Sequence, residues 1–565
     1  MEVQESKFYK NRISFKDSVK YKQMKKTVIF IAFYGFIITC SAQSINYYDL
    51  KPFRAWHLSS VPFKQPDLFP ESYLQNDNAS GFNRAKICWY SIDPLFLQNN
   101  SLTPQHIIDD PLQQKNHFTR EIISGEVYPS SQNPDEPVAT LDLGFYPNEK
   151  GAFNFDVSPS IYSFGIDSTN HLNVPSSRWG GIMRPIEKGI FTSQILNYLG
   201  FWLMDPFIYD PSQNGGYLYF NIGNVSEDVL KDGKMSYENG LPITSILTHV
   251  DTTAWGIVSD TLINNNTFST ILGSRQYQDV GLDGLGDANE RTFFQNYLNS
   301  IANLYGMNSI AYLKSYLDPS TDNYHYFRGT DLDQNQTSII KRYRNYNNYD
   351  GNSSTADMSP ESYLTNYSDI PDNEDINHNS ILDTVENYFQ YRIVLDPDSF
   401  VVGHNFITDK IIVIPANGDG SPVTWYKFLV PLNTNKREIF GNINCLDSSG
   451  FVRLFLKGFS DSLILRFLEL AFVTTDLTSI NEMPDNSAIK IYPNPSNGLI
   501  NIDNETKSVI FIKVYDLIGR ELLYSKQLEN TYNPKIDVSF LNNGMYILVI
   551  KYASHIFTKK LLIEK

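Results

Sequence analysis

The sequence predicts a mainly β protein with a β-sandwich body, a helical insertion that carries acidic loops, and a small C-terminal β-sandwich domain. Most apolar runs are short, rich in β-branched and aromatic residues, and bounded by Asn, Pro or Gly, as strands are. Only 19% of the residues are charged, and 36 Tyr and 36 Phe supply rings that fill sheet faces. One segment between the two strand-rich regions shows helical spacing instead.

The first β region of the body spans residues 43–255, with strands expected between about 85 and 245. Four runs in it read as strands: TLDLGFYP, RWGGIMRPI, FWLMDPFIYD and GGYLYFNIGN. In the last run, alternation places Leu218 and Phe220 on the face opposite Tyr217 and Tyr219. Strands at this spacing are typical of a β-sandwich.

The insertion spans residues 256–387, and a second β region follows at 388–474. Apolar residues recur at helical spacing in the insertion and resume after Gly306: Phe294, Leu298, Ile301, Leu304, Tyr305, Ile310, Leu313 and Leu317. The second β region contains further strand-like runs: YFQYRIVL, KIIVI, TWYKFLVPL, RLFLKGF and LILRFLELAFV. The body therefore consists of two sheet-forming regions on either side of a helical segment.

The last segment, residues 489–565, is a small all-β domain that follows a linker at 475–488. Pro493 and Pro495 fix extended backbone and lack N–H donors, which suits the end of a strand. The segment closely resembles the type A sorting domain of the type IX secretion system of Bacteroidetes, through the motifs YPNP, VYDLIGR, LNNGMYIL and a terminal Lys. The resemblance implies that the type IX secretion machinery binds this domain.

A signal peptide is predicted at residues 24–42. Lys25 and Lys26 form a charged start, an apolar stretch too short for a membrane span follows, and small residues precede a cleavage site after Ala42. Residues 1–23 are polar and basic, so they form a doubtful extension ahead of a true start at Met24. A weak lipobox at Cys40 leaves a lipoprotein as an alternative. We therefore expect export through the inner membrane of a Gram-negative cell, followed by secretion or surface attachment.

The charge of the chain supports an exported body. The net charge is −16 and both ends are net positive, so the body between them is strongly acidic. Such a body is unsuited to nucleic acid and attracts divalent cations. Cys88 and Cys445 remain after cleavage; we expect two buried free thiols, with a single disulfide between them as the alternative.

Two acidic loops carry the recognisable site chemistry, and both have the spacing of a calcium loop. The first places oxygen donors at positions 1, 5, 9 and 12 of such a loop: Asp279, Asp283, Asp287 and Glu290. Gly284 occupies the turn position, and the predicted helix follows directly, as in an EF-hand. Gly281 stands at position 3, where a calcium loop has another oxygen donor, which weakens the match.

The second loop matches at positions 1, 3, 5, 9 and 12: Asp375, Asn377, Asn379, Asp383 and Glu386. Ser380 replaces the turn glycine, and a strand rather than a helix follows. For both loops the alternative is a solvated acidic turn. Calcium bound in either loop would rigidify it, so its role would be structural.

The chain carries no recognisable enzyme motif: HExxH, GxSxG, a P-loop and Cys-x-x-Cys are all missing, and we expect no enzyme. His325 has no partner close in sequence that would make it a base. Asp331 and Asp333 could mimic the carboxylate pair of a glycosidase. The alternative is a short acidic turn, which is common. Three tyrosines beside arginines could stack on sugars, and we favour packing instead: Tyr343, Tyr346 and Tyr349.

From about residue 80 to 473 the body resembles an internal portion of SprA (Sov), the outer-membrane translocon protein of type IX secretion that gliding motility also requires. The resemblance is carried in collinear order by RAKICWYSIDPLF, TREIISGEVYP, TLDLGFYPNEKGAFNFD, QDVGLDGLGD, DPSTDNYHYFRGTDLD and FVRLFLKGFSDSLILRF, among others. It implies an ectodomain-like, jelly-roll-like β region. A sorting tail on such a segment is a departure from the family, because the translocon is not tagged cargo.

Together these observations predict a non-enzymatic secreted or cell-surface protein exported by type IX secretion. Its SprA-like domain would act in surface assembly, gliding motility or adhesion, by contact with an unidentified surface protein or glycan. Two alternatives remain: a fragment or component of the SprA-type translocon, and a carbohydrate-binding module.

Overall fold

A computed structural model describes the chain from residue 47 to its end, apart from short gaps. The described ranges are 47–128, 134–193, 196–261, 266–346, 351–354, 370–474, 489–504, 511–515, 521–526, 535–552 and 555–565. The predicted extension 1–23, signal peptide 24–42 and linker 475–488 lie outside these ranges. The chain divides into two compact units, Met1–Thr475 and Asp476–Lys565.

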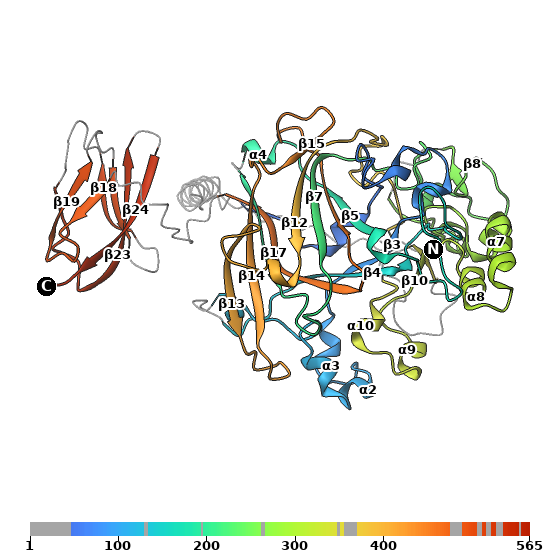
Figure 1. Cartoon of the computed structure of the whole chain (residues 1–565), viewed down its shortest axis with the longest axis horizontal. Helices are drawn as coiled ribbons and strands as arrows, with labels where there is room; N and C mark the ends of the chain where they lie inside the picture. The colour runs from blue at the N-terminus through green and yellow to red at the C-terminus, as the bar shows by residue number, and fades with distance from the viewer. Residues whose placement is uncertain are drawn as a thin grey trace, which may run out of the picture. The chain divides into compact units, whose positions relative to one another are not determined.

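Two antiparallel sheets form the body (Figure 1). In spatial order the first contains β13 (Ile407–Val413), β14 (Val423–Pro431), β6 (Tyr198–Met204), β17 (Leu463–Val473), β4 (Leu141–Lys150) and β3 (Ala85–Tyr90), with β1 (Tyr47–Asp49) paired to β17. The second contains β15 (Glu438–Phe440), β12 (Asn387–Leu395), β7 (Gly216–Asn224), β16 (Phe451–Lys457), β5 (Trp179–Pro185) and β2 (His57–Leu58).

The strand order is that of a jelly roll. The inner strands run β4-β17-β6-β14 in one sheet and β5-β16-β7-β12 in the other, so the chain passes repeatedly between the sheets. β16 and β17 follow each other in sequence, yet each lies in the middle of a different sheet. The predicted mainly β fold with a jelly-roll-like sandwich is confirmed, and every predicted body strand is present.

The hydrophobic core lies between the two sheets and is rich in aromatic rings. Phe201 of β6 stacks on Phe428 of β14 with ring centroids 4.7 Å apart. The same ring meets Phe467 of β17 at 5.5 Å and reaches across the sandwich to Phe220 of β7 at 5.9 Å. All four side chains are buried, so alternate residues of the strands close the interior.

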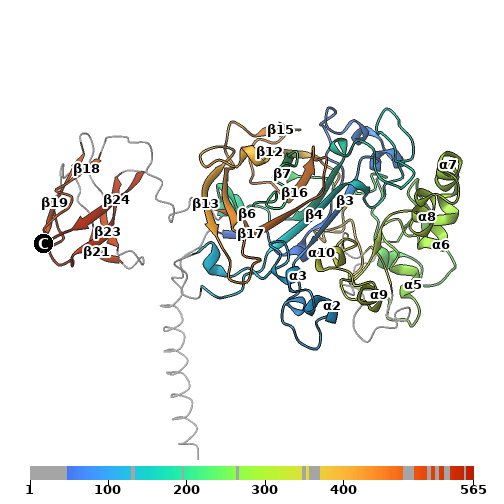
Figure 2. The same cartoon turned by 60° about the horizontal axis from the view of Figure 1, so that its bottom comes forward.

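The insertion leaves the sandwich between β7 and β12, which are hydrogen-bonded neighbours. The chain between these two strands contains β8 (Val250–Thr252), which precedes the predicted insertion, and then β9 (Ile257–Ser259), α5 (Arg275–Gln278), α6 (Asp287–Phe293), α7 (Gln295–Tyr305), α8 (Ile310–Leu317), β10 (Asn323–Tyr324), α9 (Thr330–Gln334), α10 (Ile339–Arg342) and β11 (Asn352–Ser353). Figures 1 and 2 show α7 and α8 at the side of the body away from β13. Three short helices lie elsewhere in the body: α2 (Gln105–Ile108), α3 (Pro111–Lys115) and α4 (Ile190–Ser193).

The predicted helical segment forms two helices, and only part of its apolar pattern is buried. Gly306 ends α7 at a φ of 87°, a conformation that favours glycine. Leu298 and Ile301 face the core, whereas Leu313 and Leu317 of α8 are 50% and 67% exposed. The spacing therefore predicted the helices correctly, but it did not predict which of their apolar side chains are buried.

The C-terminal unit has its own two sheets. One contains β18 (Ile489–Tyr492), β19 (Leu499–Asn504) and β22 (Lys535–Asp537); the other contains β21 (Glu521–Lys526), β20 (Phe511–Tyr515), β23 (Gly544–Tyr552) and β24 (His555–Ile563). Ile500, Ile512 and Leu548 are fully buried in its separate core. This small β domain is the one that the sequence predicts at 489–565.

Two further features bear on the predictions from sequence. Cys88 is buried in β3 and Cys445 is exposed, and both are free thiols, so the expectation that both would be buried is wrong for Cys445. Among the described residues, no helix combines the length and apolar character that a membrane span requires.

The central position of Phe467 makes it a direct test of the sandwich core. Phe467→Ala leaves a cavity between β17 and β6, so we expect unfolding free energy to fall by about 3–5 kcal/mol. Denaturant unfolding of the purified body measures the change. Ile412→Ala on the edge strand β13, where the side chain is 61% exposed, is the matched control and should change stability little.

Lys150 gives a prediction about pH. Its side chain is buried, its Nζ donates to the Tyr297 hydroxyl at 2.8 Å, and burial lowers its pKa to about 7 against the attraction of Asp156. The unfolded chain keeps this proton up to about pH 10.5, so stability falls as pH drops from 10.5 to 7.

Lys150→Met should remove this slope and raise the melting temperature at pH 7, because a buried charge is replaced by an apolar chain. Thermal melts between pH 7 and 10 measure both effects. An unchanged slope in the variant would show that Lys150 stays protonated in the fold.

Candidate functional site

The first acidic loop brings three of its four predicted ligands together and adds two carboxylates from another segment. Oxygens of Asp283, Glu290 and Asp322 lie within 4.8 Å of one another, and all three side chains are buried. Oxygens of Asp287, Glu290 and Asp318 form a second such group. These five residues are called the Glu290 cluster below, because Glu290 belongs to both groups.

The turn geometry of the loop explains how Asp322 enters it. Gly281 has a φ of 81°, and a Cβ at this position would lie 2.1 Å from Oδ2 of Asp322. The carboxylate of Asp322 therefore fills the space beside position 3, where the loop itself has no side chain. Asp318 and Asp322 flank the turn that follows α8, and they come close only because α8 packs beside α7.

Hydrogen bonds fix part of the cluster. Asp283 accepts from the Leu285 amide at 2.9 Å and from the Ser320 hydroxyl at 2.5 Å. Oε2 of Glu290 accepts from the Ser320 amide at 3.0 Å. Oε1 of Glu290 is buried and receives no hydrogen bond from any residue in the described ranges. The turn around Ser320 thus holds two of the carboxylates and leaves one oxygen directed at other acidic groups.

Burial raises the pKa of every carboxyl group in the cluster, and repulsion between carboxylates adds to this for all of them except Asp287. Burial, then repulsion from Asp318 and Asp287, raises the pKa of Asp283 to about 7. The same causes raise the pKa of Asp318 to about 6 and those of Glu290 and Asp322 well above their ordinary values. Arg291 beside Asp287 and Lys86 beside Asp318 offset this only at the edge of the cluster.

Asp279, the first predicted ligand, lies apart from the Glu290 cluster. Its Oδ2 forms an ion pair with Nε of Arg275 at 2.6 Å, and its Oδ1 accepts from the Ser353 amide at 3.2 Å. Sequence reasoning missed Asp318 and Asp322. The signal for them is the acidic pair in DPSTD, which the loop spacing alone does not connect to Glu290.

The second acidic loop closes on itself. Asp375 accepts from the amides of Asn379 at 2.9 Å and Ser380 at 2.7 Å, four and five positions further along the chain. The side-chain amides of Asn377 and Asn379 donate to Oδ2 of Asp383 at 2.8 and 3.2 Å. Four of the five predicted ligands therefore lie together around one turn. Calcium binding here stays a prediction.

Two glutamates border this second loop in different ways. Glu227, which follows β7, accepts from the backbone amides of Asn377 and Asp383, and burial followed by repulsion from Asp383 raises its pKa to about 8. Glu386, the predicted ligand at position 12, forms a two-contact ion pair with the buried guanidinium of Arg453. It also accepts from the Ser226 amide at 2.9 Å. Its carboxylate therefore joins the loop to β16, through Arg453, and to the segment that follows β7, through Ser226.

The remaining candidate side chains have structural partners. Asp331 lies 2.9 Å from His325 and Asp333 lies 2.6 Å from Arg342, so the two carboxylates serve different partners. Tyr343 and Tyr346 are buried among other rings: Tyr90, Tyr324 and Phe327. Tyr349 lies outside the described residues. The partner of His325 is Asp331, six positions further along the chain, and the sequence analysis did not predict this pair.

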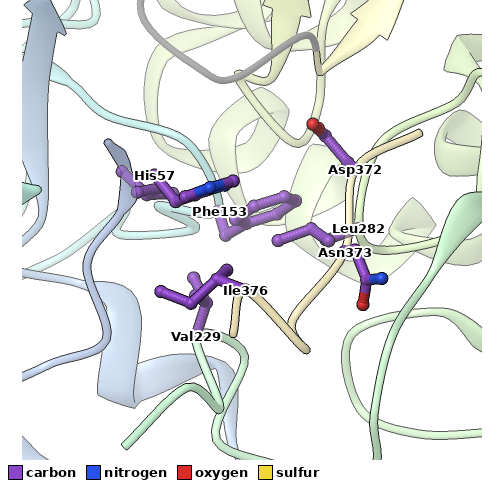
Figure 3. Close-up of a pocket in the computed structure, with 8 residues that line it drawn as sticks. His57, Phe153, Val229, Leu282, Asp372, Asn373 and Ile376 are labelled. Carbon is purple, nitrogen blue, oxygen red and sulfur yellow. The ribbon is translucent and has the colours of Figure 1, made fainter. Parts of the chain in front are cut away.

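A small cavity lies where the edge of the sandwich meets the insertion. Figure 3 shows its lining, with Leu282 beside Phe153, Ile376 beside Val229, and His57 next to Phe153. Its volume of about 20 Å³ suits about one water molecule, far below the roughly 300 Å³ of a small-molecule site. Burial lowers the pKa of His57 to about 3, so its ring is neutral.

The ion pair between Glu386 and Arg453 gives a prediction that separates it from a metal site. Glu386→Gln leaves the buried guanidinium without a charged partner and should reduce unfolding free energy by about 3–5 kcal/mol. The loss should be the same in calcium and in chelator. A loss seen only in calcium would identify Glu386 as a ligand, and Asp461→Asn on an exposed loop is the control.

Two family models match parts of the chain. Residues 296–514 match SprA_N, described as a motility related/secretion protein, and residues 490–564 match the secretion system C-terminal sorting domain. No curated protein matches the chain.

Strands within the first match pair with strands that precede it in the chain. The matched range contains β12 to β17, and these strands alternate in both sheets with β4 to β7, which precede residue 296. The matched strands therefore cannot form the sandwich without the earlier ones. The chain joins a body similar to the SprA motility and secretion family to a C-terminal sorting domain of the secretion system.

Proposed function

We propose that this protein is non-enzymatic cargo of the type IX secretion system and that its SprA-like body acts at the cell surface. Its role there would be in surface assembly, gliding motility or adhesion, through contacts with other proteins. One observation carries the proposal. The last strand of the body, β17, ends at Val473, and a second compact unit with its own core, which matches the sorting domain, follows it in the chain.

The sorting domain supports export and a surface or secreted destination. The body supports a role tied to motility or secretion, because three of the seven strands of its first sheet and three of the six strands of its second lie within the SprA_N match. A body that buries its own core and completes both sheets can be released from its tail without exposing that core.

Contacts with a protein fit the surface better than contacts with a glycan. Apolar side chains on α7 and α8 are exposed, including Leu304 at 52% and Leu317 at 67%, and such groups mark protein contact surfaces. The rings of Tyr343 and Tyr346, which were the candidates for sugar stacking, are buried.

The SprA_N match also favours a second function, as a component of the translocon itself. The two functions differ in the fate of the tail. Cargo loses its sorting domain when it leaves the cell envelope, whereas a translocon component stays in the outer membrane with the tail attached.

Deleting residues 490–565 should therefore stop export. In cells with intact type IX machinery we expect the full chain at the surface or in the medium, with its tail removed, and the shortened chain inside the envelope. Fractionation with separate probes for body and tail measures this. A full chain with an epitope tag in the 475–488 segment is the matched control. Retention of the full chain in the outer membrane with its tail would contradict the cargo proposal.

A further inference from the structure

We propose that the carboxylates of Asp283, Glu290 and Asp322 bind a calcium ion, with Asp287 and Asp318 completing the site. The ion would link the first acidic loop to the turn after α8, two segments whose contact the sequence pattern does not predict. The inference rests on the geometry of the Glu290 cluster and is independent of the proposed function.

The spacing of the oxygens fits one ion. Calcium binds six to eight oxygens at about 2.3–2.6 Å, so the ligands around one ion lie within about 5 Å of one another. The three buried carboxylates offer oxygens within 4.8 Å of one another, and so does the group formed by Asp287, Glu290 and Asp318. Glu290 belongs to both groups, as a two-oxygen ligand would.

The unsatisfied oxygen of Glu290 is a separate observation that points to a ligand. Its Oε1 is buried and receives no hydrogen bond in the described part of the chain, while Oε2 is held by the Ser320 amide. A buried carboxylate oxygen without a donor is costly. Asp283 and Asp322, which offer oxygens within 4.8 Å of Glu290, are themselves carboxylates and supply no positive charge.

The backbone is shaped to admit the distant ligand. Only a glycine at position 281 leaves room for the carboxylate of Asp322, because a Cβ there would overlap its Oδ2. In a standard calcium loop, position 3 supplies its own oxygen. Here the oxygen beside position 3 comes from Asp322 in the other segment, because the fold brings that residue next to Gly281.

The donor set favours calcium over other cations. All five groups of the Glu290 cluster are carboxylates, which suit a hard cation rather than zinc or copper. Magnesium keeps several of its waters and needs a strict octahedron, whereas calcium accepts a crowded, irregular set of carboxylates. Asp287 and Asn323 line an adjoining hollow of about 790 Å³, which gives an ion a route to the buried groups.

The ion would also fasten the insertion to the sandwich. Ser320 lies between Asp318 and Asp322 and donates to both Asp283 and Glu290. Its carbonyl accepts from the amide of Phe153, which follows β4, at 2.6 Å. A chain of contacts therefore runs from the carboxylates to the sheet, and an ion that relieves the repulsion between the carboxylates would stabilise the turn that carries it.

The test uses the mature full chain, stripped of metal with EGTA and titrated with CaCl₂ by calorimetry and thermal melting. We expect calcium to bind and to raise the melting temperature, and MgCl₂ at the same concentration to have a much smaller effect. Glu290→Gln should weaken binding by more than the roughly 10–100-fold that loss of an outer-shell partner costs. It should also remove the calcium-dependent rise in melting temperature.

Two features keep the test decisive. Glu290→Gln relieves repulsion, so without calcium it should melt no lower than the parent, whereas a residue needed only for packing would lower the melting temperature. Asp279→Asn, in the same loop but paired with Arg275, should keep the calcium response. The proposal is wrong if calcium leaves the parent unchanged, if magnesium acts equally, or if Glu290→Gln responds like the parent.

Discussion

The placement of β16 and β17 in the centres of two different sheets is the constraint on which the body depends. β16 pairs with β5 and β7, while β17 pairs with β4 and β6. Neither sheet is continuous until these last two strands of the body are in place. Residues 47–473 must therefore close as one unit through contacts distant in sequence, and the insertion is held between two strands that are already paired.

The pairing of strands that are distant in sequence also explains where the acidic residues of the body lie. Several carboxylates are buried and accept backbone N–H groups from distant segments, so they fasten loops to the sandwich. Glu238 accepts from Val280, Gly281 and Asp372. Glu374 does the same for Val229, Leu230 and Ser236. Hydrogen bonds satisfy these two groups, whereas Oε1 of Glu290 is buried beside other carboxylates and has no donor in the described part of the chain, which supports the proposed cation site there.

Sequence reasoning succeeded where local chemistry decides the structure. Strand runs such as TLDLGFYP and GGYLYFNIGN became β4 and β7, in which residues of both faces are buried. Loop spacing selected Asp283, Asp287 and Glu290, which the fold does bring together, because they lie close to one another in sequence. The same spacing could not find Asp322, which reaches the loop only through packing of α7 beside α8.

Local spacing also selected two acidic residues that pair with a basic residue outside the loop motif, one of them close in sequence and the other distant. Asp279 is paired with Arg275 and Glu386 with Arg453, and neither basic residue belongs to the loop motif. The sequence predicts which groups are acidic and how they are spaced. Which of them meet a guanidinium, and which meet only other carboxylates, depends on strand order and on the side of the sandwich that each loop leaves.

The account rests on a body that is one closed sandwich and a sorting domain that can be separated from it. Calorimetric unfolding of the mature chain, before and after cleavage in the 475–488 segment, measures this most directly. We predict a single cooperative transition for the body whose melting temperature is the same with and without the tail. A body transition that divides into two, or that shifts when the tail is removed, would contradict the account.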